Sequence, residues 1–176
     1  MKQTRHLLIA LALGTMLTSC GASVSTATVT GPAAYVDPYI GSGGHGHVFV
    51  GASVPFGAIQ AGPQNIHKGW DWCSGYHHSD SIVIGFAHTH LSGTGCTDMG
   101  DVQIMPYTGE LRSKRGRQED IGGSCSSYYS HDNESVSPGY YSLKMDNGVR
   151  IEMTASTRTA LHRITYPEAE GRRLLI

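Results

Sequence analysis

The chain has 176 residues, and its 13 Lys and Arg against 14 Asp and Glu give a formal net charge of -1 at pH 7. This balance gives no electrostatic basis for binding nucleic acid, which needs a basic surface. Charged residues make up only 15% of the sequence and Gly is abundant, which favours an extracytoplasmic all-β domain.

The N-terminal segment is predicted to be an export signal. Residues 1–19 combine basic residues with the apolar run "LLIALALGTML", which is too short to span a bilayer. The sequence "LTSC" that follows resembles a bacterial lipobox, in which the cysteine, here Cys20, becomes lipidated. Residues 20–34 are then the lipidated Cys20 and a flexible tether. We expect an outer-membrane lipoprotein of the bacterial cell envelope that contacts the membrane only through its lipid anchor.

Residues 35–176 are long enough for one domain, and their patterns are those of β-strands. We expect strands, in chain order, at 81–88, 101–107, 139–145, 149–155 and 159–167, with another beginning in "RRLLI". Asn147-Gly148 predicts a type I′ turn between the third and fourth. Short strands linked by tight turns predict a β-sandwich. The apolar run at the end of the sequence, with no partner strand expected, suggests that the sandwich is truncated before its final strands.

Three cysteines remain once Cys20 carries lipid, namely Cys73, Cys96 and Cys125. An odd number in an oxidising compartment permits at most one disulfide and leaves one free thiol. Cys73 and Cys96 flank the predicted strand at 81–88 and could be neighbours, but the sequence leaves the pairing open.

Two histidine pairs, His45 with His47 and His88 with His90, have the spacing that places both side chains on one face of an extended chain. Each pair could supply two metal ligands, and Cys96, Asp98 and Asp101 are near enough in sequence to complete a zinc sphere. No spacing matches a named zinc motif. The alternative is a polar cleft lined with hydrogen-bonding histidines.

Trp70 and Trp72 flank Asp71 in the stretch "GWDWC". An indole ring stacks on the C–H face of a pyranose, while carboxylate and imidazole groups bind its hydroxyls, so this combination suits a carbohydrate site. The alternative is that one Trp is a core residue and the other covers an edge.

The segments "VDPYIGSGGHGHVFVGASVPFGAIQAGP" and "GWDWCSGYHHSDSIVIGFAHTHLSGTGCTDMGDVQIMP" resemble the N-terminal domain of glycoside hydrolase family 92, and the resemblance runs from Tyr35 to the end of the sequence. It implies a supersandwich-like β-domain followed by a C-terminal (α/α)₆ barrel. The activity implied is that of a calcium-dependent, inverting exo-α-mannosidase acting on mannose-terminated glycans. Inversion requires a general acid and a general base placed on opposite faces of the sugar.

The resemblance also implies how the site is divided. The catalytic carboxylates and most calcium ligands belong to the C-terminal domain, so this chain is expected to hold no catalytic or metal residues and to be inactive alone. Trp70 and Asp71 are expected to contact the sugar. The other expected contributors to the cleft are Gly43, Gly44, His45, His88, His90 and Asp98. Two alternatives stay open: a non-catalytic mannoside-binding lipoprotein, and a periplasmic zinc-binding lipoprotein using His88 and His90.

Overall fold

The computed structural model describes residues 30–97, 100–114 and 121–176, so Cys20, the signal segment and Asp98 lie outside the described residues. These ranges contain strands and short 3-10 turns and no α-helix. No helix in them is both long and apolar enough to cross a bilayer. The strands are β1 (Ala52–Ser53), β2 (Gln60–Asn65), β3 (Ile82–Ala87), β4 (Met105–Tyr107), β5 (Ser127–Tyr128), β6 (Glu134–Ser137), β7 (Tyr140–Lys144), β8 (Arg150–Ala155), β9 (Ala160–Thr165) and β10 (Arg173–Leu175). The 3-10 turns are η1 (Gly31–Tyr35), η2 (Trp70–Trp72) and η3 (His131–Asn133).

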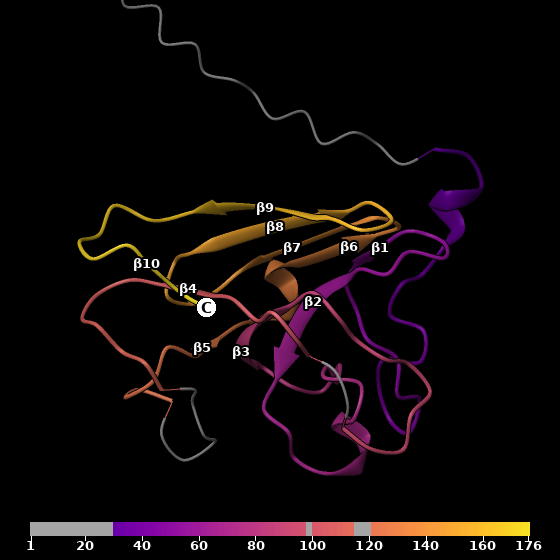
Figure 1. Ribbon diagram of the computed structural model, residues 1–176, viewed down its shortest axis with the longest axis horizontal. Helices are drawn as coiled ribbons and strands as arrows, with labels where there is room; N and C mark the ends of the chain where they lie inside the picture. The colour runs from indigo at the N-terminus through magenta and orange to yellow at the C-terminus, as the bar shows by residue number, and fades with distance from the viewer. Residues whose placement is uncertain (1–29, 98–99, 115–120) are drawn as a thin grey trace, which may run out of the picture.

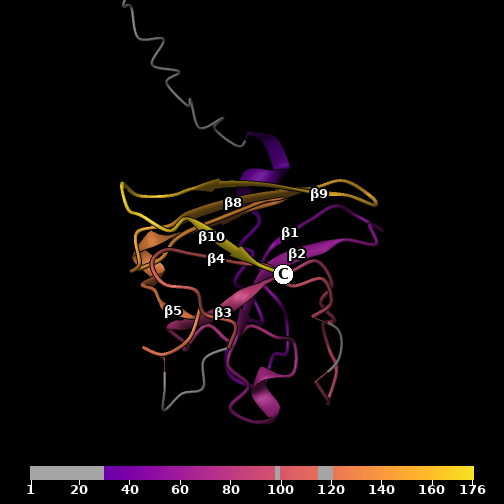
Figure 2. The same ribbon diagram turned by 60° about the vertical axis from the view of Figure 1, so that its left-hand side comes forward.

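Two antiparallel sheets form the two layers of a β-sandwich, which confirms the predicted fold class. One sheet has the order β6-β7-β8-β9, and the other has the order β1-β2-β3-β5. A bridge between Phe86 and Ile104 attaches β4 to β3, and β10 pairs with β4. Strands β1 and β2 contact β8 in the opposite sheet. In both overall views the β6–β9 sheet lies above β2, β3 and β5 (Figures 1 and 2).

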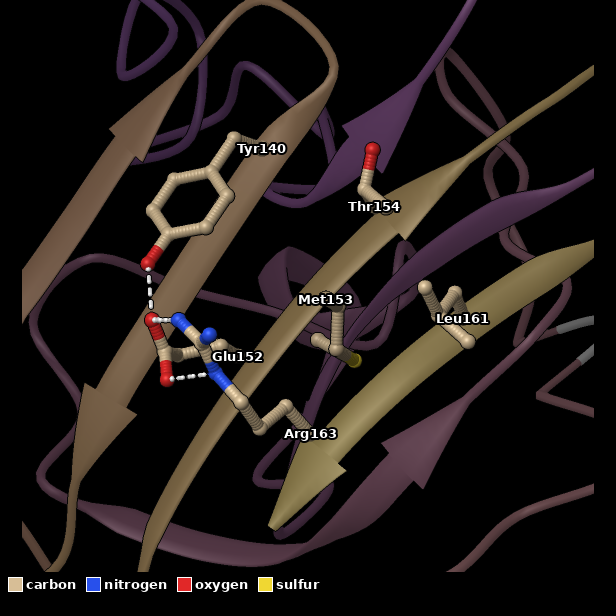
Figure 3. Close-up of a pocket in the computed structure, with 6 residues that line it drawn as sticks. All are labelled: Tyr140, Glu152, Met153, Thr154, Leu161 and Arg163. Atoms are coloured by element: carbon tan, nitrogen blue, oxygen red, sulfur yellow. Dashed lines mark hydrogen bonds and ion pairs between the residues drawn. The ribbon is translucent and has the colours of Figure 1, made fainter. Parts of the chain in front are cut away.

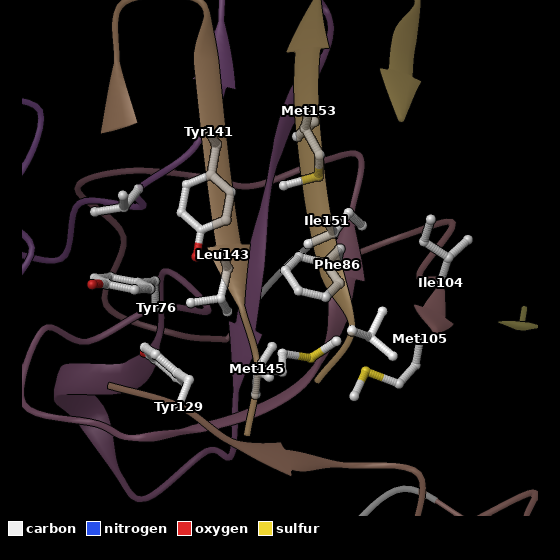
Figure 4. Packing of buried hydrophobic residues seen from close by; sticks show 14 of the residues in the cluster. Tyr76, Phe86, Ile104, Met105, Tyr129, Tyr141, Leu143, Met145, Ile151 and Met153 are labelled. Carbon is white, nitrogen blue, oxygen red and sulfur yellow. The ribbon is translucent and has the colours of Figure 1, made fainter. Parts of the chain in front are cut away.

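The core lies between these sheets because alternate residues of the strands point inward. Tyr141 and Leu143 of β7 and Ile151 and Met153 of β8 are buried, and they face Phe86 of β3 (Figure 4). These side chains belong to one contiguous hydrophobic cluster. The outward residues of β7 and β8 include Lys144, Arg150 and Glu152, so in this sheet the hydrophobic face is the one that packs on the opposite layer.

The hairpin between β7 and β8 is confirmed, but the predicted type I′ turn is wrong. Such a turn needs positive φ at both central residues, and of Asn147 and Gly148 only Gly148 has it, at 83°. Gly148 N donates to Met145 O at 2.9 Å, and Met145 N donates to Val149 O at 2.9 Å. The loop is therefore a three-residue connection closed by a left-handed glycine. Asn147 Oδ1 accepts a hydrogen bond from Val149 N at 3.0 Å.

The strand predictions succeed where the pattern is strongest. The expected strands at 81–88 and 159–167 match β3 and β9, whereas only the end of 101–107 is a strand, β4. The final run forms β10, which pairs antiparallel with β4 through Leu174 opposite Pro106. The expectation that this run lacks a partner is therefore wrong. Strands β1, β2, β5 and β6 were not predicted, since they are short or interrupted by Gly and Pro.

Candidate functional site

Three loops meet on one side of the sandwich, and their residues define the candidate site: His45 and His47, Trp70 and Asp71, and Thr94. The first two come from the glycine-rich loop before β1, the next two from η2, and the last from the loop after β3. The side chains are brought together by contacts between loops that are distant in sequence.

Asp71 is the centre of the polar contacts in the site. His45 Nδ1 lies 2.6 Å from Asp71 Oδ1, and His47 Nε2 lies 3.4 Å from the same oxygen. The hydrogen bond from His45, reinforced by the one from His47, lowers the pKa of Asp71 below its ordinary value. Asp71 is therefore held as a carboxylate. Both histidines use Oδ1, and Oδ2 faces no hydrogen-bond partner among the described residues.

Trp70 presents an aromatic surface beside this carboxylate. Its side chain remains exposed at 57%, although both histidine rings contact it. The His47 ring meets the indole edge to face at a centroid distance of 4.2 Å, and the His45 ring lies at 5.6 Å. The indole is therefore fixed by its neighbours while much of its surface stays open to a ligand.

Backbone groups of the loop after β3 hold His47 in place. His47 Nδ1 donates to Thr94 O at 2.8 Å, and Gly93 N donates to His47 O at 2.8 Å. A Cβ added at Gly95 would lie 3.5 Å from Trp70 Nε1, so this loop also passes close to the indole. His47 has a φ of 52°, which a non-glycine residue seldom adopts and which these contacts maintain.

The buried side chain of Asp80 holds the turn η2 in place. Asp80 Oδ2 accepts a hydrogen bond from Trp72 Nε1 at 2.8 Å, and Oδ1 accepts one from Lys68 Nζ at 3.0 Å. The Trp72 ring also stacks on His77 at 4.3 Å. Trp72 thus anchors the segment while Trp70, two residues earlier, faces outward.

The structure brings Trp70, Asp71 and His45 together, with Gly43 and Gly44 next to His45 in the chain. Gly44 O lies 3.2 Å from His77 Nε2, which fastens the glycine-rich loop to the segment that carries η2. The His-x-His spacing identifies His47 only as a possible metal ligand, and the sequence does not place it among the sugar contacts. No local signal marks Thr94.

His88 and His90 do not join this cluster. His88 Nδ1 donates to Val102 O, and His88 Nε2 lies 2.9 Å from His162 Nε2 in β9. His90 is buried, with Nδ1 2.8 Å from Gln60 O and Nε2 3.1 Å from Gln64 Oε1. The two side chains therefore have separate partners, although their spacing predicts a shared face.

The zinc alternative receives no support from this geometry. Among the described residues no group of three or more His, Cys, Asp and Glu could hold a metal ion. Asp98, the further residue expected in the cleft, lies outside the described residues. Cys73, Cys96 and Cys125 are all free thiols in the structure.

A second polar cluster lies on the outward face of the β6–β9 sheet, in a shallow recess of about 250 Å³ (Figure 3). Arg163 donates from Nε to Glu152 Oε2 at 2.6 Å and from Nη2 to Oε1 at 2.5 Å. Tyr140 OH donates to Glu152 Oε1 at 2.7 Å. None of the predicted site residues lines this recess. Because its polar groups already bind one another, we assign the cluster to the stability of the sheet.

The hydrogen bonds from Arg163 and then Tyr140 lower the pKa of Glu152 from 4.5 to about 2. A depressed carboxyl pKa adds stability above the unfolded-state value and loses it as the pH falls through the folded-state value. We expect Arg163→Met to lower the free energy of unfolding by about 1 kcal/mol at pH 7. The difference from wild type should shrink between pH 4.5 and pH 2. Urea unfolding at several pH values measures it, and a difference that grows in acid would contradict the assignment.

Arg150→Met is the matched control for this prediction. Arg150 Nη2 lies 3.8 Å from Glu152 Oε1, and it makes no bidentate contact. Arg150→Met should therefore lower the free energy of unfolding by less than Arg163→Met does at neutral pH.

Known proteins are similar to this chain in both sequence and fold. A profile of the glycosyl hydrolase family 92 N-terminal domain matches residues 35–176. An uncharacterized secreted glycosidase of Arthroderma benhamiae is 32% identical over an alignment of 142 residues, which covers 76% of this chain and 17% of that protein.

Solved structures agree. A family 92 α-mannosidase of Bacteroides thetaiotaomicron, solved in complex with mannoimidazole, is 42% identical with a TM-score of 0.77 over 81% of this chain and 19% of that one. A family 92 inverting mannosidase of the same bacterium is 25% identical with a TM-score of 0.62 over 83% of this chain and 20% of that one. The chain thus spans about a fifth of the length of these relatives. It belongs to glycoside hydrolase family 92, and its residues 35–176 are the N-terminal domain of that family.

Proposed function

We propose that this domain completes the sugar pocket of an inverting exo-α-mannosidase that hydrolyses terminal α-mannosides of glycans. The observation that carries the proposal is the exposed Trp70 indole fixed beside the Asp71 carboxylate. Family membership and the likeness to two mannosidases support the substrate class.

The chemistry of the site matches what a pyranose needs. The open face of Trp70 offers a surface for the C–H groups of the ring. Asp71 Oδ2 is a hydrogen-bond acceptor for a hydroxyl group, and exposed His45 offers its second ring nitrogen. Because Asp71 is already held by two histidines, it would orient the hydroxyl without first having to be ordered.

Catalysis is proposed to come from the rest of the enzyme. Inverting hydrolysis uses two carboxyl groups about 6.5–9.5 Å apart. The candidate site contributes one carboxylate, Asp71, which is engaged by His45 and His47. We therefore assign Asp71 to substrate binding and propose that this chain alone does not hydrolyse mannosides.

Calcium and the membrane anchor are part of the same proposal. The calcium of the full-length enzyme is proposed to bind mainly to the C-terminal domain, as the family resemblance implies. Lipid on Cys20, which lies outside the described residues, would hold the protein at the outer membrane of a bacterial cell. Mannose-terminated glycans outside the cytoplasm would be its substrate.

The test joins this chain to the part of the 42% identical Bacteroides α-mannosidase that it does not cover. We expect no release of 4-nitrophenol from 4-nitrophenyl α-mannoside by the chain alone, and release by the joined protein. Trp70→Ala in the joined protein should lower kcat/KM about tenfold or more, because a stacked aromatic ring contributes on the order of 1–2 kcal/mol.

Tyr128→Ala provides the control, since Tyr128 is an aromatic residue of β5 exposed at 47% that belongs to no part of the candidate site. Equal kcat/KM in the Trp70 and Tyr128 variants would contradict the proposed pocket. Binding of mannose by the chain alone, combined with an inactive joined protein, would favour the non-catalytic mannoside-binding alternative.

A further inference from the structure

Two cysteines are associated with one residue of the candidate site, Thr94. Cys73 directly follows η2, is buried, and its Sγ donates to Thr94 O at 2.9 Å. Cys96 is exposed and lies two residues beyond Thr94. Thr94 Oγ1 donates to Cys96 O at 2.8 Å, which folds the chain back between the two residues. The proposed function leaves both thiols without a role.

We propose that Cys73 and Cys96 are an oxidation site, and that a disulfide between them fastens the loop after β3 to η2. The structure shows the reduced form of this pair. The oxidant belongs to the class of low-molecular-weight disulfides, of which oxidised glutathione is the simplest probe.

Cys96 lies near the carbonyl that Cys73 contacts, and the disulfide requires the loop to bring the two cysteines within reach. Bridged cysteines have Cα atoms about 4.4–6.8 Å apart. Thr94 and Cys96 are separated by at most about 7 Å of chain, and the turn closed by Thr94 shortens this separation further. Cys73 Sγ already touches the carbonyl from which that turn begins. Glycines at positions 93 and 95 allow the loop to adjust, and Gly93 already has a φ of 74°.

Cys125 is a poor competitor for either thiol because it contacts a different segment. Its Sγ donates to Arg112 O at 3.0 Å and its N donates to Lys114 O at 3.1 Å, whereas Cys73 contacts Thr94. Burial also raises the pKa of the Cys125 thiol, which lowers the fraction of reactive thiolate. Exposed Cys96 meets a dissolved disulfide first, and Cys73, in contact with Thr94 O, is the thiol assigned to resolve the product.

The reaction balances as two thiol exchanges. The Cys96 thiolate attacks one sulfur of oxidised glutathione, which forms a mixed disulfide and releases one glutathione thiolate. Cys73 then gives its proton to water and attacks the Cys96 sulfur, which releases the second glutathione. The protein loses two thiol protons and two electrons, and one glutathione disulfide is reduced to two thiols.

A disulfide between Cys73 and Cys96 would change the contacts that position the loops of the candidate site. Thr94 O loses the hydrogen bond from Cys73 and keeps the one from His47. The loop that supports His47 and passes Trp70 becomes covalently tied to the turn that carries Trp70. That consequence for sugar binding rests on the proposed function, whereas the existence of the disulfide does not.

The experiment uses the purified full chain, incubated with oxidised glutathione, alkylated in denaturant with iodoacetamide and digested with trypsin. Trypsin places Cys73 and Cys96 in one peptide, residues 69–112, and Cys125 in another, residues 118–144. We expect the first peptide to be lighter by two hydrogen atoms and unalkylated, with Cys125 still alkylated. Closing this loop should raise Tm by about 5–10 °C, and dithiothreitol should reverse the rise.

Cys96→Ser replaces an exposed residue and should keep the fold while abolishing both effects. Cys125→Ser should retain them. The proposal fails if the peptide of residues 69–112 keeps two alkylated thiols, if Cys96 links to Cys125, or if Tm rises equally in the Cys96→Ser variant. The mass of this peptide is measured without sugar, so a failure of mannoside binding leaves the disulfide result intact.

Discussion

Replacing Glu134 by alanine is expected to lower the free energy of unfolding by about 3–5 kcal/mol, because it removes a buried acceptor that three donors share. The side chain of Glu134 is fully buried. Its Oε2 accepts from His131 Nδ1 at 2.7 Å and from Tyr76 OH at 3.0 Å, and its Oε1 accepts from Tyr141 OH at 2.7 Å.

The donors in this network cannot find other partners easily. Tyr76 and Tyr141 are buried, and burial followed by the charge of Glu134 raises the pKa of both phenols well above the ordinary value. Both phenols therefore remain protonated donors at every pH at which the protein would be studied. Without Glu134, Tyr141 OH and His131 Nδ1 would lose their acceptor, and Tyr76 OH would keep only His78 Nδ1, which lies 3.4 Å away.

Urea unfolding followed by circular dichroism measures this loss. Tyr141→Phe is the matched control, since it removes one hydroxyl group and leaves the carboxylate with two donors. We expect it to lower the free energy of unfolding by about 1 kcal/mol. The loss of unfolding free energy in Glu134→Gln should lie between these two values, because the amide oxygen of Gln can still accept hydrogen bonds. If Glu134→Ala unfolded at the same urea concentration as Tyr141→Phe, the network would contribute no more than a single hydrogen bond.

The sequence predicts those parts of the fold that depend on local pattern. Alternation identifies β7, β8 and β9, and a β-branched apolar run identifies β3. Strand β2 reads "QAGPQN" and lacks any such pattern, yet it pairs with β3 along most of its length. Its strand character comes from the partner and from burial against β8, which no local pattern encodes.

Some residues of the candidate site can likewise be predicted from the sequence, whereas the contacts between them cannot. Trp70 and Asp71 are adjacent in sequence and chemically distinctive, so local composition marks them as candidates, and the family resemblance favours them over the alternative of a core Trp. His45 reaches Asp71 across 26 positions, and no spacing rule predicts that contact. His88 and His90 lie just past the end of β3, where the strand geometry that would align them no longer applies. Each therefore binds whichever neighbour the tertiary fold supplies.

The loops that carry the site have little apolar surface, and buried polar residues hold them instead. Asn65 in β2 illustrates this role: its Oδ1 accepts from His77 N at 2.9 Å, and its Nδ2 donates to Ile82 O at 2.8 Å. This one side chain joins both ends of the segment between β2 and β3, which includes η2. The position of Trp70 therefore depends on groups that never touch a ligand.

Asp80 is the strongest of these anchors, and Asp80→Ala is expected to cost about 3–5 kcal/mol of unfolding free energy and to displace η2. Asp80 Oδ2 accepts from Trp72 Nε1, and Oδ1 accepts from Lys68 Nζ. Oδ1 also accepts from the backbone N of Ser81 at 2.8 Å and of Ile82 at 3.1 Å. Removing the carboxylate leaves an indole N–H, two amides and an ammonium group without their acceptor.

Lys68→Met separates the ion pair from the rest of this anchor. It removes one donor that is 24% exposed and leaves Trp72 and both amides bound to Asp80, so we expect a loss of about 1 kcal/mol or less. Tryptophan fluorescence at low urea should shift in Asp80→Ala, because Trp72 loses its fixed environment. The shift should be smaller in Lys68→Met, which removes the ammonium group 5.8 Å from the Trp72 ring centroid but leaves the indole bound to Asp80. An unchanged spectrum in Asp80→Ala would mean that stacking on His77 suffices to hold η2, and that the carboxylate is not what positions Trp70.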